Sequence, residues 1–408
     1  MSHQRAKSVF LEIIEADPEH RTAMLDRLCA GDEALALRVR DLLCAHDRAT
    51  AVLADPSSAP TIDSSILAAF GTPAAAVGSK IGPYTLVRIL GEGGFGTVYE
   101  ARQDVPVRRT VALKLIRPGM GSRDVVARFE AERQALAVMD HPGIARVIEA
   151  GTTEAGLPYF VMEYVDGLEI TEFCDQARLP IHDRVGLFEQ VCHAVQHAHA
   201  KGLIHRDLKP SNILVTRVDG KPFAKVIDFG IAKVLGASSI ADPKLTLPSQ
   251  IVGTPLYMAP EQASQETLDI DARADVYSLG AILYELLAGV PPISPDRLSR
   301  ARIAEIERII REDDAARPSR RVRELSRQER MQVASARSIE PGRLAGEVEG
   351  DLDWIVGRAM EKSRDRRYGA PLALAADLAR YMRDEPVDAG PPSVSYKLAK
   401  FARRHRIE

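Results

Sequence analysis

A short stretch near the middle of the chain concentrates side chains that could act on a phosphoryl group. Asp207, Lys209 and Asn212 lie close together, and Asp228 follows soon after. A transferring phosphoryl group needs positioning and charge neutralisation more than covalent chemistry. Asp207 can hold and deprotonate an attacking hydroxyl, while Lys209 can neutralise the moving charge. Because Mg²⁺ takes one or two protein oxygens together with phosphate oxygens, Asn212 and Asp228 are the candidate metal ligands.

A glycine-rich segment earlier in the chain predicts a loop that approaches phosphates closely. Small residues let backbone N–H groups come near an anion. The residues after the loop, Thr97 to Ala101, continue the pattern of a strand. A dinucleotide-binding loop would lead into a helix instead, so that alternative is disfavoured. The loop residues expected to contact a nucleotide are Leu90, Gly91, Glu92, Gly93, Gly94, Phe95, Gly96, Thr97 and Val98.

Five motifs, taken in their order, carry a family resemblance. They are Leu90–Val98, Val111-Ala112-Leu113-Lys114, His205–Asn212, Asp228-Phe229-Gly230 and Ala259-Pro260-Glu261. In this order they resemble the motifs of eukaryotic-like (Hanks-type) serine/threonine protein kinases of bacterial type. The resemblance covers about residues 82 to 387. It implies an α+β, two-lobed protein-kinase fold, with a small antiparallel-sheet lobe carrying one main helix and a larger, mainly helical lobe.

The same resemblance implies cofactors and partners. The cofactors would be ATP and Mg²⁺, with Mn²⁺ as an alternative metal. The partners would be proteins phosphorylated on serine or threonine, and the chain itself through autophosphorylation. A dimer is an open alternative. The sequence identifies neither the protein substrates nor the activating signal.

Lys114 has apolar neighbours in sequence, so its ammonium group needs an anionic partner. The helix expected over residues 124–138 offers Glu132, which shares a face with Val125, Phe129 and Leu136. A carboxylate in an apolar stripe needs a cation for the same reason. Pairing of Lys114 with Glu132 resolves both problems and resembles the lysine–glutamate ion pair of protein kinases. A solvent-exposed Glu132 is the alternative.

The resemblance also places the residues around the adenine base. Met162 would stand beside the base at the end of a strand. The backbone C=O of Glu163 and the N–H of Val165 would form hydrogen bonds with it. The apolar residues that would sandwich the base are Leu90, Val98, Ala112 and Leu214. These side chains would serve the core as well, so the two roles coexist.

Arg206 precedes the predicted base, and in similar kinases such an arginine binds a phosphate on the activation segment. Thr246 and Ser249 are the candidate phosphorylation sites. Thr254 is expected to orient Asp207 and Lys209 instead. An arginine without a partner beside the base would leave the loop unordered until a phosphate arrives. A loop already ordered by its own packing is the alternative.

The resemblance also implies three contacts that support the fold. Asp275 should brace the catalytic loop, Glu261 should pair with Arg367, and His205 should pack against Phe229. A metal site could also be read into His193, His197 and His199. The kinase resemblance places these three residues on the helix before the catalytic loop, where they are interpreted as ordinary helix residues.

Two other classes of protein compete with an active protein kinase. A pseudokinase would bind nucleotide and signal as a scaffold. Substitution at Lys114, Asp207, Asn212 or Asp228 would favour it, yet all four residues are intact. A small-molecule phosphotransferase usually lacks the Ala-Pro-Glu segment, which indicates a platform for a peptide.

Composition limits the partners and the cellular location that we expect for the protein. The net charge of −3 argues against a general nucleic-acid partner. Four cysteines without a C-x-x-C pair indicate free thiols in a reducing compartment. The sequence shows neither a signal-peptide pattern nor an apolar run long enough to span a bilayer. We therefore expect a cytoplasmic location, with the inner face of the membrane as a candidate contact of the basic tail.

The pattern along the chain predicts four segments. Residues 1–47 should form a small helical segment and residues 48–81 a flexible linker. The kinase domain should span residues 82–387. Its lobes would be 82–163 and 166–387, with an Arg-rich, solvated insertion at about 295–350 made of short helices and a loop. The basic tail, 388–408, is either a surface helix or a membrane-proximal segment.

Overall fold

A computed structural model describes most of the chain after residue 74. The described residues are 75–93, 96–116, 139–154, 156–229, 254–263, 270–391 and 393–405, besides positions 24, 27–29 and 39. The chain divides into two units, Met1–Pro73 and Ala74–Glu408, and every element named below belongs to the second. Apart from those five positions, the helical segment predicted over 1–47 lies outside the described residues, as does the helix predicted over 124–138.

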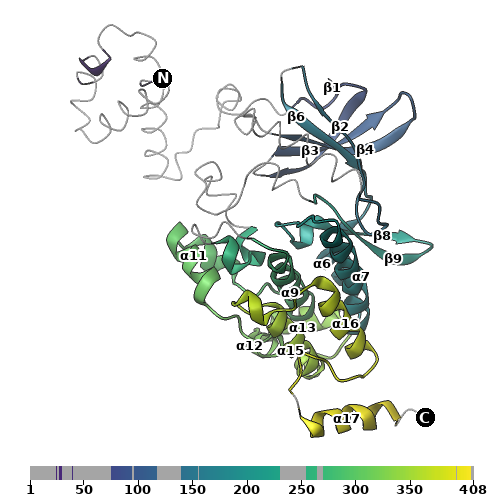
Figure 1. The fold of residues 1–408 in the computed structure, drawn as a ribbon, viewed down its shortest axis with the longest axis vertical. Coiled ribbons are helices and arrows are strands. Elements are labelled where there is room, and N and C mark those ends of the chain that lie inside the picture. Colours follow the sequence, from purple (N-terminus) through teal and green to yellow (C-terminus); the bar gives the residue numbers. More distant parts are fainter. Residues whose placement is uncertain are drawn as a thin grey trace. The chain divides into compact units, whose positions relative to one another are not determined.

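The smaller lobe is an antiparallel sheet with the strand order β1-β2-β3-β4-β6-β5 (Figure 1). The strands are β1 (Lys80–Ile81), β2 (Tyr84–Gly93), β3 (Gly96–Gln103), β4 (Arg109–Ile116), β5 (Val147–Thr152) and β6 (Pro158–Glu163). The strand predicted from Thr97 to Ala101 is confirmed within β3. Strands β2 and β3 pair as far as Gly93 and Gly96, so the described glycines of the glycine-rich segment lie at the adjoining ends of two antiparallel strands.

Strand β4 shows how alternation positions a functional side chain. Successive side chains of a strand point to opposite faces of the sheet. Val111, Leu113 and Leu115 belong to the core of the small lobe. Ala112 and Ile116 belong instead to the larger core that continues into the helical lobe. Lys114 lies between these two in the alternation, so its side chain is carried on the face turned toward the helical lobe.

The folded unit begins earlier than the sequence suggested. Residues 80 and 81 were expected to be part of the linker. They form β1, which pairs with Tyr84 and Thr85 of β2, and Ile81 is buried. The short strand is specified by a single buried side chain and a tight turn at Gly82, which has a φ of +52°. A pattern this short carries too little periodicity for detection.

The larger lobe is mainly helical, with one small sheet ordered β7-β8-β9 (Figure 1). Its strands are β7 (Leu168–Glu169), β8 (Ile213–Val218) and β9 (Lys221–Val226). Its helices are α6 (Ile170–Gln176), α7 (Ile181–Ala200), α9 (Arg273–Ala288), α10 (Pro295–Ser299), α11 (Ile303–Glu312), α12 (Pro318–Glu324), α13 (Arg327–Ala336), α14 (Leu344–Val348), α15 (Asp351–Ala359), α16 (Pro371–Met382) and α17 (Val394–His405). Short 3₁₀ turns are η3 (Pro210–Asn212), η5 (Thr254–Tyr257), η6 (Pro260–Gln262) and η7 (Arg364–Arg366). The two-lobed α+β fold is confirmed.

Helix α9 is the centre of the larger lobe. Nearly all of its residues are buried, as expected for a helix that is apolar all round. The helix ends at Gly289, which adopts a left-handed φ of +76°. A Cβ at this glycine would also lie 2.6 Å from Val333 of α13, so both backbone and space require glycine.

The region 295–350 forms the predicted short helices, but its description as a solvated insertion is wrong. Ile306, Ile309 and Ile310 of α11 are buried in the core of the lobe, as is Val322 of α12. The buried Arg337, which follows α13, donates hydrogen bonds to the carbonyls of Leu286 (2.7 Å) and Leu287 (2.9 Å) at the end of α9. The arginines that suggested a solvated surface thus include one that seals the end of the central helix.

No helix among the described residues is both long enough and apolar enough to cross a membrane.

Candidate active site

The catalytic loop brings Asp207, Lys209 and Asn212 into direct contact. The Lys209 Nζ atom donates a hydrogen bond to Asp207 Oδ2 at 2.9 Å. The Asn212 Nδ2 atom donates to the backbone carbonyl of Asp207 at 2.7 Å. Asn212 is buried at the end of η3, a short 3₁₀ turn that begins at Pro210. Three residues singled out by type and spacing therefore share one small volume.

Asp275 holds the catalytic loop from the side of α9, as predicted. Its carboxylate accepts the backbone N–H groups of His205 and Arg206, each at 2.8 Å, and lies 2.7 Å from His199 Nε2. Only 1% of Asp275 is exposed. Burial alone would raise the pKa of this carboxyl, but the hydrogen bond and charge of His199 hold the pKa below its usual value. The loop is thus fixed to an ionised carboxylate.

Three more contacts fix the same loop. The His205 ring packs against Phe229 with centroids 4.7 Å apart, which confirms that prediction, and its Nε2 atom lies 2.9 Å from the carbonyl of Ile227. Gln262 Nε2 donates a hydrogen bond to the carbonyl of Arg206 at 2.7 Å. Sequence reasoning missed both His199 and Gln262 as supports. The position of Gln262 directly after the Ala-Pro-Glu motif was the available signal.

Lys114 pairs with Asp228 in this structure. Its Nζ atom lies 2.6 Å from Asp228 Oδ2, and the side chains are 10% and 18% exposed. The strand alternation described above brings the lysine to this side of the sheet. Glu132, its predicted partner, lies outside the described residues, so that pair stays a prediction. The observed ion pair therefore joins Lys114, the predicted nucleotide ligand, to Asp228, a predicted metal ligand.

The candidate metal ligands lie on neighbouring segments. The backbone N–H of Ile227 donates to the carbonyl of Asn212 at 2.9 Å, which places Asp228 next to the end of the catalytic loop. Because Asn212 Nδ2 is engaged with Asp207, its Oδ1 atom is the one left to act as a ligand. Carboxylate and amide oxygens suit Mg²⁺. The donor set therefore fits the predicted metal.

The glycines of the glycine-rich segment differ in their surroundings. A Cβ at Gly96 would lie 2.1 Å from the backbone oxygen of Leu115, so this glycine is required by packing between β3 and β4. Among the described atoms, nothing lies within 4 Å of a Cβ built at Gly91 or Gly93. These two positions have open space, as a phosphate-binding loop needs. Gly94 and Phe95 lie outside the described residues.

The predicted adenine residues come from both lobes, and Ala112, Met162 and Val98 belong to or pack against one core. Ala112 on β4 pairs directly with Met162 on β6, and both are buried. Val98 packs against the same core from β3, and Leu214 lies in β8. The Glu163 side chain bonds Lys225 of β9 at 2.5 Å, where the chain passes between the lobes. Leu90 is partly exposed on β2, and Val165 follows β6.

The histidines of α7 have partners other than a shared metal. His199 binds Asp275, as described, and His193 lies 3.7 Å from Glu189. The ring of His197 lies 5.0 Å from the ring of His141. Burial, with the neighbouring histidines, lowers the pKa of His141. Their interpretation as helix residues agrees with these contacts.

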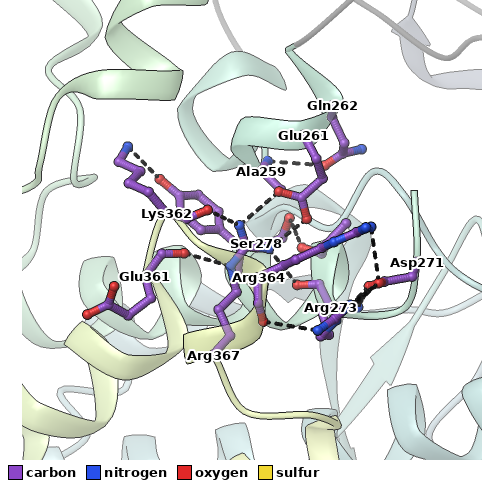
Figure 2. A network of polar contacts seen from close by, with 12 residues as sticks. Ala259, Glu261, Gln262, Asp271, Arg273, Ser278, Glu361, Lys362, Arg364 and Arg367 are labelled. Carbon is purple, nitrogen blue, oxygen red and sulfur yellow. Dashed lines mark hydrogen bonds and ion pairs between the residues drawn. The ribbon is translucent and has the colours of Figure 1, made fainter. Parts of the chain in front are cut away.

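Glu261, the last residue of the Ala-Pro-Glu segment, forms a buried ion pair with Arg367, as predicted (Figure 2). The guanidinium group donates to both carboxylate oxygens, at 2.6 and 2.8 Å. It also donates to the carbonyls of Glu361 (2.6 Å) and Arg273 (3.0 Å). Arg367 therefore joins η6, the start of α9 and the segment after α15. Thr254 opens η5 in the same region, and its expected contact with Asp207 and Lys209 stays a prediction.

We expect Arg367→Met to destabilise the domain by about 3–5 kcal/mol, because the buried Glu261 carboxylate loses the guanidinium group that donates to both of its oxygens. Urea unfolding monitored by circular dichroism measures the change in the free energy of unfolding. The control is Arg383→Met, whose partner Glu385 lies 3.3 Å away in an exposed pair. The control should shift stability by less than about 0.5 kcal/mol. Equal stabilities of the two variants would contradict the bracing role.

Comparison with known proteins agrees with this geometry. The profile of the protein kinase domain family matches residues 84–375. Serine/threonine-protein kinase PknB of Mycolicibacterium smegmatis is 35% identical over 313 residues, which cover 75% of this chain and 44% of the relative. Serine/threonine-protein kinase Pkn1 of Myxococcus xanthus is 40% identical over 230 residues, covering 56% of this chain and 32% of the relative. The chain thus spans less than half of the length of the curated relatives it matches.

Solved structures lead to the same family. A double mutant of the Mycobacterium tuberculosis PknI kinase domain has a TM-score of 0.51 and 25% sequence identity, covering 75% of this chain and 98% of that domain. The crystal structure of the PknI kinase domain has a TM-score of 0.50 and 26% identity over the same shares. With its matched profile, its motifs and its fold, the chain belongs to the protein kinase domain family and is similar to bacterial Hanks-type serine/threonine kinases.

Proposed function

We propose that the chain transfers the γ-phosphoryl group of ATP to serine or threonine hydroxyl groups of proteins. The observation that carries this proposal is the contact set Asp207–Lys209–Asn212, held on the ionised Asp275. A pseudokinase would not need a carboxylate, an ammonium and an amide in this mutual geometry. The named relatives, which are serine/threonine-protein kinases, support the choice of acceptor.

Asp207 accepts the proton of the attacking hydroxyl and holds its oxygen in line with the phosphoryl group. Lys209, 2.9 Å from the same carboxylate, supplies positive charge where negative charge develops. Thr254 is proposed to orient this pair through its hydroxyl. When bound, the metal neutralises charge on the phosphates, and Asn212 and Asp228 would hold it. Magnesium is the proposed metal, with manganese as an alternative.

Lys114 is the proposed phosphate ligand from β4. Its present partner is Asp228 at 2.6 Å, so it must exchange a contact when nucleotide and metal arrive. Glu132 is proposed to receive it then. The nucleotide would lie under the Leu90–Val98 segment. Its base would lie between the small-lobe side chains and Leu214, with hydrogen bonds to the backbone of Glu163 and Val165.

Transfer of label tests this function directly. The purified chain is incubated with γ-labelled ATP, Mg²⁺ and an unstructured protein rich in serine and threonine. We expect label on serine or threonine that depends on Mg²⁺. Nucleotide binding without label transfer, to the chain or to the added protein, would favour the pseudokinase alternative.

Arg206 supports a proposal about activation. Its Nε atom is buried, and no hydrogen-bond partner for it occurs among the described residues. A buried guanidinium nitrogen without a partner is costly, so an arriving anion would be stabilised there. A phosphate carries a charge of about −1.5 to −2 and can make one to three charge-assisted hydrogen bonds. We place this phosphate on Thr246 or Ser249, which lie outside the described residues.

Replacing both hydroxyls tests the activation step. The wild-type chain should show a lag in activity that pre-incubation with ATP removes. The double variant Thr246→Ala with Ser249→Ala should stay slow with or without pre-incubation, because Arg206 never gains its anion. The control replaces Ser299, whose hydroxyl donates to the backbone carbonyl of Asp296 within α10, with alanine. Full activity of the double variant without a lag would refute the switch.

Other partners follow from the same activity. Protein substrates and the chain itself are the proposed acceptors, and a cytoplasmic location is proposed because ATP is available there. Dimerisation remains a separate hypothesis. Contact of the basic tail with a membrane surface is taken up next, from the structure of α17.

A further inference from the structure

Helix α17 is attached to the helical lobe by polar contacts. Lys400 Nζ lies 2.5 Å from Asp351 Oδ2, and both side chains are less than 10% exposed. The Tyr396 hydroxyl donates to the other oxygen of Asp351 at 2.9 Å and accepts the N–H of Val387 at 3.0 Å. The Tyr396 ring meets Trp354 edge-on, with centroids 5.2 Å apart. One face of the helix is therefore fixed to α15 and the segment after α16.

The large apolar side chains of α17 lie on the face away from these contacts. Val394, Leu398 and Phe401 follow one another at spacings of four and three, so they form one stripe at 100° per residue. They are 73%, 61% and 56% exposed. Tyr396 and Lys400 lie on the opposite side of the helix by the same geometry. A surface helix ordinarily buries its apolar stripe, and α17 does the reverse.

Charge indicates what would cover this stripe. Residues 394–406 contain five lysines and arginines and no aspartate or glutamate, in a chain whose net charge is −3. Lys400 forms an ion pair with Asp351. The other four basic residues in the sequence of this segment are Lys397, Arg403, Arg404 and Arg406. A second copy of the helix would bring like charges together. An anionic surface with an apolar interior is complementary to both features.

We infer that α17 is a membrane-binding face that lies in the plane of an anionic lipid surface, with Leu398, Phe401 and Val394 inserted among the lipid chains. The docked lysine and tyrosine then connect that surface rigidly to the kinase domain. The helix has 12 residues, which suits lying in the interface and is too short to span the hydrocarbon core of a bilayer. This inference does not depend on phosphoryl transfer, so the two proposals can fail separately.

Vesicle flotation with the full chain tests the inference. The vesicles contain phosphatidylcholine with about 30% phosphatidylserine, or phosphatidylcholine alone. We expect the chain to float with the anionic vesicles, less at high salt, and poorly with the neutral ones. The variant Leu398→Gln with Phe401→Gln keeps every charge. Its partition coefficient should fall about tenfold or more, because two inserted apolar side chains are lost.

A matched control removes apolar surface elsewhere. Met331 and Leu372 are 53% and 51% exposed on α13 and α16, and the variant Met331→Gln with Leu372→Gln should float like the wild type. Thermal unfolding of each variant checks that the fold is kept. Absence of flotation with anionic vesicles would overturn the inference, even if the chain bound an acidic protein. Equal flotation of the wild type and the α17 variant would overturn it too, as would equal binding to neutral vesicles.

Discussion

Replacement of Asp207 with asparagine is expected to lower the turnover of phosphoryl transfer by about 10²–10⁴-fold. The amide keeps the shape of the side chain but cannot take the proton of the attacking hydroxyl. It also loses the charge that holds Lys209 at 2.9 Å. ATP affinity should be nearly unchanged, because the proposed nucleotide contacts come from the small lobe and Leu214. Turnover with labelled ATP and equilibrium binding of nucleotide measure the two effects separately.

The control for this variant is Asp219→Asn. Asp219 is an exposed residue in the turn between β8 and β9, with a φ of +49° that asparagine also accepts. The control should turn over like the wild type. If Asp207→Asn also retained wild-type turnover, the assignment of the base would be wrong. If it lost nucleotide binding as well, the effect would be structural, and the role proposed for the carboxylate would again be unsupported.

Replacement of Lys114 with methionine is the second large effect. The ammonium group is the cation that β4 carries to the side of Asp228, 2.6 Å away. Without it, the phosphates lose a positive charge at the point where charge develops, and turnover should fall on the order of 10²-fold or more. Asp228 also loses its partner while only 18% exposed, so its placement should change. Steady-state turnover at saturating ATP and Mg²⁺ measures the loss.

The matched control for Lys114→Met is Lys221→Met. Lys221 is an exposed lysine at the start of β9 and makes no contact with the catalytic loop in the described structure. It should leave turnover within about twofold of the wild type. Wild-type turnover of Lys114→Met would remove this lysine from the mechanism, whatever its partner is.

The sequence was informative where chemistry requires a fixed residue at a fixed spacing. Asp207, Lys209 and Asn212 were identified by their types and spacing, and the structure brings them into contact. Strand β4 was predictable because its apolar residues serve two cores, which makes a continuous run interrupted only by Lys114. The brace of Asp275 and the pair of Glu261 with Arg367 followed from the family resemblance and are confirmed.

The sequence could not predict which acidic residue Lys114 contacts, nor which residues of the region 295–350 are buried. Lys114 has two acidic candidates, and which one it contacts depends on the positions of both lobes, not on spacing. In the region 295–350, the arginines hid three buried isoleucines of α11. Arg337 is itself buried because its nitrogens satisfy carbonyls at the end of α9. Composition does not show such a role, since a buried arginine and a solvated one look alike in sequence.

The central claim is that this chain is an active kinase with Asp207 as its base. Mass spectrometry of the purified chain after incubation with ATP and Mg²⁺ tests it most directly, with Asp207→Asn treated in parallel. We predict added phosphate on serine or threonine residues of the wild-type chain, within the segment between Asp228 and Glu261, and none on the variant. An unmodified wild-type chain that also fails to phosphorylate added protein, or equal phosphorylation of the wild type and the variant, would contradict the account.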